Sequence, residues 1–171
     1  MIIDLTELLS NEGKKREVHT EYSDDYFVSA YGKYLITDKE SMTVQLTNIG
    51  NKTILVETDI VIKMNIPCDR CLSDVIHSFN IKVSKEVNLN DTNTNDEDSE
   101  EMSYLVDGKL DVDKLVYEEL LVNLPAKSLC NVDCKGLCKK CGKNLNFDNC
   151  DCDTVVLDPR MAKIRDIFRT E

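Results

Sequence analysis

The sequence predicts an α+β fold: mainly an antiparallel sheet with one packed helix, then a cysteine-rich tail and a terminal helix. Two long runs of alternating apolar and polar residues predict the sheet, and six cysteines between Cys130 and Cys152 predict the tail. Alternation with one wet face is typical of antiparallel pairing, and it is also compatible with a sheet that closes into a barrel.

Two strands of the predicted sheet form a long hairpin. The first places on one face Ile54, Val56, Thr58, Ile60, Ile62, Met64 and Ile66. The second does the same with Val75, His77, Phe79, Ile81, Val83, Val87 and Leu89. The hairpin tip between them carries the motif Cys68-Asp-Arg-Cys71. Shorter alternating or β-branched runs predict further strands at residues 18–22, 26–36 and 42–46, with a turn at 48–51.

Helical periodicity occurs at three places. Leucines at positions 5, 8 and 9 behind Asp4 predict a short N-terminal helix with Asp4 as its N-cap. Residues 111–124 predict a helix that Asp111 caps and Pro125 ends. The pair Asp158-Pro159 opens a last helix with an apolar and a basic side.

Composition divides the chain into two domains. Residues 1–127 form a β-rich domain that contains helix 111–124 and an acidic loop at 90–103, where six acidic residues stand without a basic one. Residues 128–171 form a cysteine-rich zinc-binding tail with the C-terminal helix. No apolar run is long enough to cross a membrane as a helix.

The tail predicts a zinc site. Cys138 and Cys141 are separated by two residues and followed by Gly142, which lets backbone amides approach the sulfurs, and Cys150 and Cys152 complete a four-sulfur set. A disulfide framework is the alternative. Since the chain opens without a secretory signal, we expect reduced thiols in a cytoplasmic protein, where such sets hold a metal.

The remaining four cysteines suggest a second zinc site. The hairpin pair Cys68 and Cys71 would join Cys130 and Cys134, whose spacing one helical turn presents on a single face. A single larger tail site, in which Cys134 replaces one of the four tail ligands, remains open. A redox dithiol at Cys68 and Cys71 is a further alternative, although the strand–turn–strand context lacks the helix that such chemistry uses.

Catalysis is not indicated. The chain has two histidines, of which His77 lies on the inward face of its strand and is expected to be packed or hydrogen-bonded. No phosphate loop or zinc-hydrolase motif is present, and a closed four-cysteine site leaves no position for a reactive water. We therefore expect a protein that is not an enzyme and has no small-molecule substrate.

Several motifs together resemble one family. They are Pro67-Cys-Asp-Arg-Cys-Leu72, a helix ending at Leu124-Pro125, the run from Cys134 to Asn146, Cys150-Asp-Cys152, Asp158-Pro-Arg160 and the opening Met1 to Leu9. This set closely resembles the bacterial YceD family, once catalogued as a domain of unknown function. Lys139 stands where the common form has a proline, which should not affect ligation. The resemblance implies a role in 23S ribosomal RNA accumulation and large-subunit assembly.

The partner is left open between two classes. The net charge of -11 favours a basic ribosomal protein of the large subunit, because an acidic protein repels nucleic acid at long range. A local basic face could instead hold 23S RNA or a pre-ribosomal particle, and its candidate residues are Lys135, Lys139, Lys140, Lys143 and Arg160. The same lysines could simply balance the charge of a thiolate-rich zinc. A zinc-based or thiol-based redox sensor is a third reading.

Overall fold

The computed structural model describes residues 1–89 and 104–152. They form two compact units. The sheet unit comprises Met1–Ile66 and Asp74–Ser128, and the cysteine unit comprises Pro67–Ser73 and the chain from Leu129 onward. The predicted domain boundary after residue 127 remains a prediction. The acidic loop at 90–103, the terminal helix and Arg160 lie outside the described residues.

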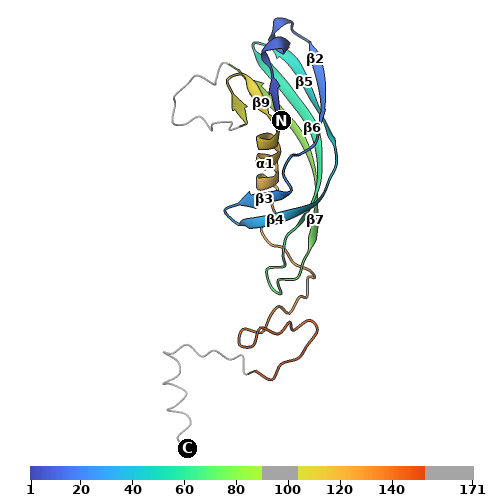
Figure 1. Cartoon of the computed structure of the whole chain (residues 1–171), viewed down its shortest axis with the longest axis vertical. Helices are drawn as coiled ribbons and strands as arrows, with labels where there is room; N and C mark the ends of the chain where they lie inside the picture. The colour runs from blue at the N-terminus through green and yellow to red at the C-terminus, as the bar shows by residue number, and fades with distance from the viewer. Residues whose placement is uncertain (90–103, 153–171) are drawn as a thin grey trace, which may run out of the picture. The chain divides into compact units, whose positions relative to one another are not determined.

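An antiparallel six-stranded sheet dominates the sheet unit (Figure 1). Its strands are β2 (Lys15–Thr20), β3 (Tyr26–Ser29), β4 (Gly32–Lys39), β5 (Met42–Gly50), β6 (Thr53–Asn65) and β7 (Ile76–Asn88). One edge of β6 pairs with β7 along its whole length. The other edge pairs with β5 at one end and with β4 at the other. β2 extends the sheet from β5, and β3 extends it from β4.

A smaller sheet lies beside the helix. β1 (Ile2–Asp4) pairs with β9 (Lys109–Asp111), which pairs with β8 (Leu105–Val106). A 3-10 helix, η1 (Thr6–Ser10), follows β1. α1 (Val112–Val122) follows β9 and lies on the concave side of the large sheet (Figure 1). No described helix is long and apolar enough to cross a membrane.

The core lies between the large sheet and α1, as the alternation predicted. Every second residue of β6 from Ile54 to Met64 is buried, and α1 buries Val112, Leu115, Val116 and Leu120. His77 is half-buried, and its Nε2 lies 2.9 Å from the hydroxyl oxygen of Ser128, which confirms the hydrogen-bonded role expected for this histidine.

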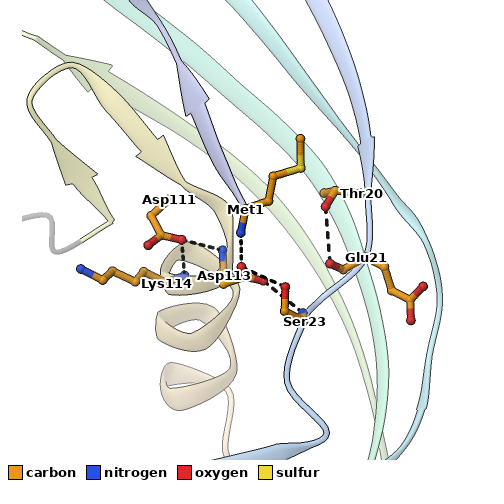
Figure 2. Close-up of polar contacts among 7 residues, drawn as sticks. All are labelled: Met1, Thr20, Glu21, Ser23, Asp111, Asp113 and Lys114. Atoms are coloured by element: carbon orange, nitrogen blue, oxygen red, sulfur yellow. Dashed lines mark hydrogen bonds and ion pairs between the residues drawn. The ribbon is translucent and has the colours of Figure 1, made fainter.

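Polar contacts hold the start of α1. The Asp111 carboxylate accepts hydrogen bonds from the backbone N–H groups of Asp113 and Lys114, which confirms the predicted cap. The Asp113 carboxylate accepts from the backbone N–H and the hydroxyl of Ser23, both at 3.1 Å, and pairs with the Met1 amino group (Figure 2). The chain between β2 and β3 is therefore tied to α1.

Three predictions need correction. The barrel alternative is wrong, because the sheet stays open and no described strand joins β7 to the opposite side. The predicted strand over residues 26–36 is a hairpin, because Gly32, at φ +151°, starts a second strand that returns along the first. The short N-terminal helix is present as η1, but its N-cap is Leu5 rather than Asp4, because Asp4 belongs to β1 and pairs with Lys109 of β9.

Candidate metal centres

The turn at the tip of the β6–β7 hairpin gathers backbone N–H groups around one sulfur. The Leu72 N–H donates to the Cys68 carbonyl at 2.9 Å, which closes a tight turn over Cys68-Asp-Arg-Cys71. Burial of the Cys68 thiol opposes ionisation, but the N–H groups of Cys130, Arg70 and Cys71 outweigh it and lower its pKa to about 6. This turn is therefore built to stabilise a thiolate.

The second CxxC motif folds into the same turn. The Gly142 N–H donates to the Cys138 carbonyl, again at 2.9 Å. Backbone N–H groups of Cys141 and Lys140 lower the pKa of Cys138 to about 6. The residue after each motif has a left-handed backbone, with φ of +60° at Leu72 and +73° at Gly142. The sequence showed the glycine of this turn but not that a leucine fills the same role at the hairpin tip.

The cysteines group into two sets of four. One set is Cys68, Cys71, Cys130 and Cys134, and the other is Cys138, Cys141, Cys150 and Cys152. Within each set all four sulfurs lie within 4.8 Å of one another. The structure thus places Cys134 with the hairpin cysteines and not in the tail set.

Sulfur separations in the first set suit a metal better than a disulfide. The Cys71 and Cys130 sulfurs are 3.4 Å apart, and those of Cys68 and Cys134 are 3.9 Å apart. A disulfide needs about 2.05 Å. Four sulfurs at about 2.3 Å from a tetrahedral metal are separated by about 3.8 Å. The donor set and its spacing therefore fit a tetrahedral ion, although the assignment of these residues as ligands stays a prediction.

Cys130 and Cys134 are presented by an irregular turn, not by the helical turn expected. The Asn131 side chain accepts from the backbone N–H of Asp133 at 3.1 Å, and the Asn131 carbonyl accepts from Cys134 at 3.1 Å. An asparagine that bonds the backbone two residues ahead favours such a turn over a helix. The cysteine spacing alone did not reveal this.

Three residues that sequence reasoning missed support the first set around Cys134. The Asn146 amide donates to the Cys134 sulfur at 3.3 Å and accepts from the Lys135 N–H at 2.8 Å. The Arg70 guanidinium donates to the Cys134 carbonyl at 2.8 Å. Gly136, at φ +78°, passes so close to the Arg70 carbonyl that an added Cβ would lie 2.9 Å from the oxygen. The glycine in Cys134-Lys-Gly-Leu-Cys138 was the visible signal of this close approach.

The candidate lysines are on the surface of the cysteine unit. Lys135, Lys139, Lys140 and Lys143 are all exposed. Phe147 and Val132 of the same unit are exposed as well. The described part of this unit contains five basic and four acidic residues, so charge alone does not single it out as a nucleic-acid site.

Comparison with known proteins identifies the family. A family model described as "Large ribosomal RNA subunit accumulation protein YceD" matches residues 56–168. The uncharacterized protein YlbN of Bacillus subtilis is 26% identical over 125 residues, which is 72% of each chain. The uncharacterized protein Rv2926c of Mycobacterium tuberculosis is 29% identical over 105 residues, 61% of this chain and 50% of the relative. The match thus spans about half the length of the mycobacterial relatives.

A plant relative has a more informative name. The "Large ribosomal RNA subunit accumulation protein YCED homolog 1, chloroplastic" of Arabidopsis thaliana is 36% identical over 44 residues, 26% of this chain and 14% of the relative. No solved structure matches the chain. Since the family model covers well over half of the sequence and begins within the hairpin that carries the first CxxC turn, the chain belongs to the YceD family, whose name implies a role in the accumulation of the large ribosomal RNA subunit.

Proposed function

We propose that the chain is a non-catalytic zinc protein of large-subunit assembly that binds two structural zinc ions. The observation that carries this is the pair of closed tetrathiol sets, Cys68/Cys71/Cys130/Cys134 and Cys138/Cys141/Cys150/Cys152. Soft thiolates in tetrahedral groups of four favour zinc over hard cations such as magnesium or calcium. Four cysteines fill the coordination sphere, so such an ion stabilises structure and leaves no site for a reactive water.

The proposed biological role is the one that the family name implies. The protein would act in the cytoplasm to support 23S ribosomal RNA accumulation, through a basic ribosomal protein or through the RNA itself. In the sheet unit, 18 acidic residues stand against 12 basic ones among the described positions, which supports the basic protein as partner.

Native mass spectrometry tests the metal assignment. Protein purified without chelator should carry two zinc ions, and the double substitutions Cys68→Ser/Cys71→Ser and Cys138→Ser/Cys141→Ser should each leave one. A single zinc that survives the hairpin substitution would reject the first site. The role is tested separately by depleting the protein in its host and measuring the ratio of 23S to 16S RNA; an unchanged ratio would reject it.

Direct RNA binding is a second candidate, supported by the exposed lysines around Cys138 and Cys141 and by the exposed Phe147 ring. Affinity for large-subunit RNA fragments should then fall with salt and with Lys139→Glu/Lys140→Glu. Insensitivity to both changes would exclude it.

A redox sensor is a third candidate, supported by the exposure of Cys130 and Cys141. It requires zinc loss on mild oxidation and zinc recovery on reduction. Retention of the metal under dilute peroxide would leave the purely structural role.

A further inference from the structure

The β3–β4 hairpin exposes apolar side chains on its outer face. Its inner face contributes Phe27, which is fully buried, to the core. On the outer face Tyr26 is 47% exposed and lies directly opposite Leu35, which is 43% exposed. Val28 lies two residues further along the same face, and Tyr31 at the turn is 78% exposed. We call these four residues the hairpin patch.

Elsewhere the outer face of the same sheet is mostly polar, although Ile49 of β5 and Ile76 of β7 are exposed on it. β6 presents Glu57 and Asp59 there, and β7 presents Ser78, Asn80 and Lys82. The hairpin patch groups four exposed apolar side chains, whereas Ile76 lies opposite the polar Asn65. An apolar cluster bordered by polar residues is typical of a surface that binds another molecule.

An open hollow of about 520 Å³ adjoins the hairpin patch. Tyrosine and aspartate side chains dominate its lining, which consists of Tyr22, Ser23, Asp24, Asp25, Tyr26, Val28, Lys33 and Tyr117. Desolvation raises the pKa of Tyr22, so its phenol stays protonated at neutral pH. The hollow thus combines aromatic rings, which attract cations through their faces, with carboxylates that attract them by charge.

Contacts on three sides hold the hollow in shape. The Tyr117 ring from α1 stacks on Phe27 with centroids 5.0 Å apart. The segment before β3 is tied to α1 through the two hydrogen bonds from Ser23 to Asp113 (Figure 2). The Lys39 ammonium bonds the Asp25 carboxylate at 3.1 Å and the Asp24 carbonyl at 3.3 Å. A partner would therefore meet a site that is already formed, which reduces the entropy lost on binding.

The protein's own Lys33 shows that a cation can sit against this surface. Its Nζ lies 4.1 Å from the centroid of the Tyr26 ring, at the border of hollow and patch. Lysine and arginine make such contacts through the same electrostatic attraction to the ring face. β3 is also the last strand in the order of the sheet, so an extended segment can approach it from the side.

We propose that the hairpin patch and the adjoining hollow bind a protein segment rich in arginine or lysine and interspersed with apolar residues. A basic side chain occupies the hollow between the tyrosines and Asp24, and apolar side chains cover Val28 and Leu35. The proposal adds a binding site to the proposed function. It rests on that function for one premise, namely that the partner is a basic protein.

Binding of synthetic peptides to the full-length, zinc-loaded protein tests it. The probe is a short peptide that alternates arginine and leucine, compared with one that has glutamate in place of arginine and with a single-stranded uridine oligonucleotide. Fluorescence anisotropy gives the affinity, and backbone amide shifts locate the site. We expect binding of the basic peptide alone, with shifts confined to Tyr22–Leu35 and α1.

Matched variants distinguish binding at this site from attraction by the net charge of the protein. Asp24→Lys should weaken binding about tenfold, whereas Asp59→Lys, which changes the net charge equally on the outer face of β6, should change it less than about twofold. Tyr26→Ser should weaken binding, and Val122→Ser, another exposed apolar residue, should not. Unchanged backbone amide shifts in β6 and β7 and an unchanged urea midpoint show in each variant that the sheet unit keeps its fold.

Three results would overturn the proposal. Equal losses of affinity for Asp24→Lys and Asp59→Lys would mean that the net charge attracts the peptide and that no specific site binds it. Amide shifts of the same residues by the oligonucleotide would make the surface one for RNA. Equal binding of the glutamate peptide would show that binding does not need a cationic side chain. None of these results touches zinc stoichiometry or the RNA ratio, so the proposed function stands or fails separately.

Discussion

The sheet unit and the cysteine unit bury different kinds of side chain. The aliphatic core, from Ile3 through Leu120, lies entirely within the sheet unit. In the described part of the cysteine unit, the buried hydrophobic residues are all cysteines: Cys68, Cys71, Cys134 and Cys138. Of its large apolar side chains, Leu72, Val132 and Phe147 are exposed, and Leu129, Leu137 and Leu145 are only half-buried. We infer that burial of apolar surface stabilises the first unit and that metal ligation stabilises the second.

Removal of the metal is the strongest test of this contrast. Structural zinc contributes about 10–16 kcal/mol in small zinc domains, far more than the cysteine unit can recover from burial. A chelator should therefore abolish amide hydrogen-exchange protection in 67–73 and 129–152 while β6 and β7 keep theirs. Protection that persists in the cysteine unit would show that its fold does not depend on metal.

Ile60→Ala tests the opposite unit. The Ile60 side chain is fully buried in the middle of β6, so its truncation should cost about 2–5 kcal/mol of unfolding free energy. Urea denaturation measures the loss, and Val61→Ala, a half-buried neighbour on the other face, is the control with a smaller expected effect. Zinc content should stay unchanged at low urea; a loss of zinc would mean that the two units are not independent.

Asn146→Leu probes the hydrogen bond that supports the first cysteine set. The substitution removes the amide that donates to the Cys134 sulfur. Outer hydrogen bonds of this kind are worth about 10–100-fold in metal affinity. Titration against a competing chelator should show weaker binding at the first site. Asn149→Leu, in the same loop and also exposed, is the matched control, and an equal effect there would deny Asn146 a specific role.

The smallest expected effect concerns the two matching turns. A left-handed backbone costs a non-glycine residue about 1 kcal/mol, and Leu72 has this backbone with an exposed side chain. Leu72→Gly should therefore tighten metal binding slightly, since strain relief is partly offset by greater freedom of the unfolded chain. Gly142→Leu should weaken it. The same chelator competition measures the metal affinity of both variants. If the two substitutions change this affinity in the same direction, the two turns are not equivalent.

Much of the sheet unit was predictable because its signals are local. The alternation at 54–66 and 75–89 specified both strands and the inward face of each, and Asp111 and Pro125 delimited the helix closely. The errors arose where a distant partner overrode local propensity. Asp4 does not cap the first helix because it lies in a strand that pairs with β9, and residues 26–36 turn back at Gly32, whose positive φ the sequence does not reveal.

The hairpin patch could not be recognised from the sequence. Tyr26 and Val28 alternate with Phe27 in a run where either face could be the inner one, because both faces are apolar. Only the packing of Phe27 against Tyr117 decided which side is buried. The hollow has the same origin, since its lining comes from two strands, the segment before them and α1.

By itself the sequence determined that the chain combines an antiparallel sheet with two CxxC turns, because both depend on spacings of a few residues. It also determined membership of the YceD family, through motifs that are local in the chain. The tertiary structure alone decided that Cys134 joins the hairpin cysteines, and that Asn146 and Arg70 support it. The contacts of Cys134 with Cys68 and Arg70 depend on chain segments about 60 residues apart meeting in space, and loop closure over such lengths leaves no local trace.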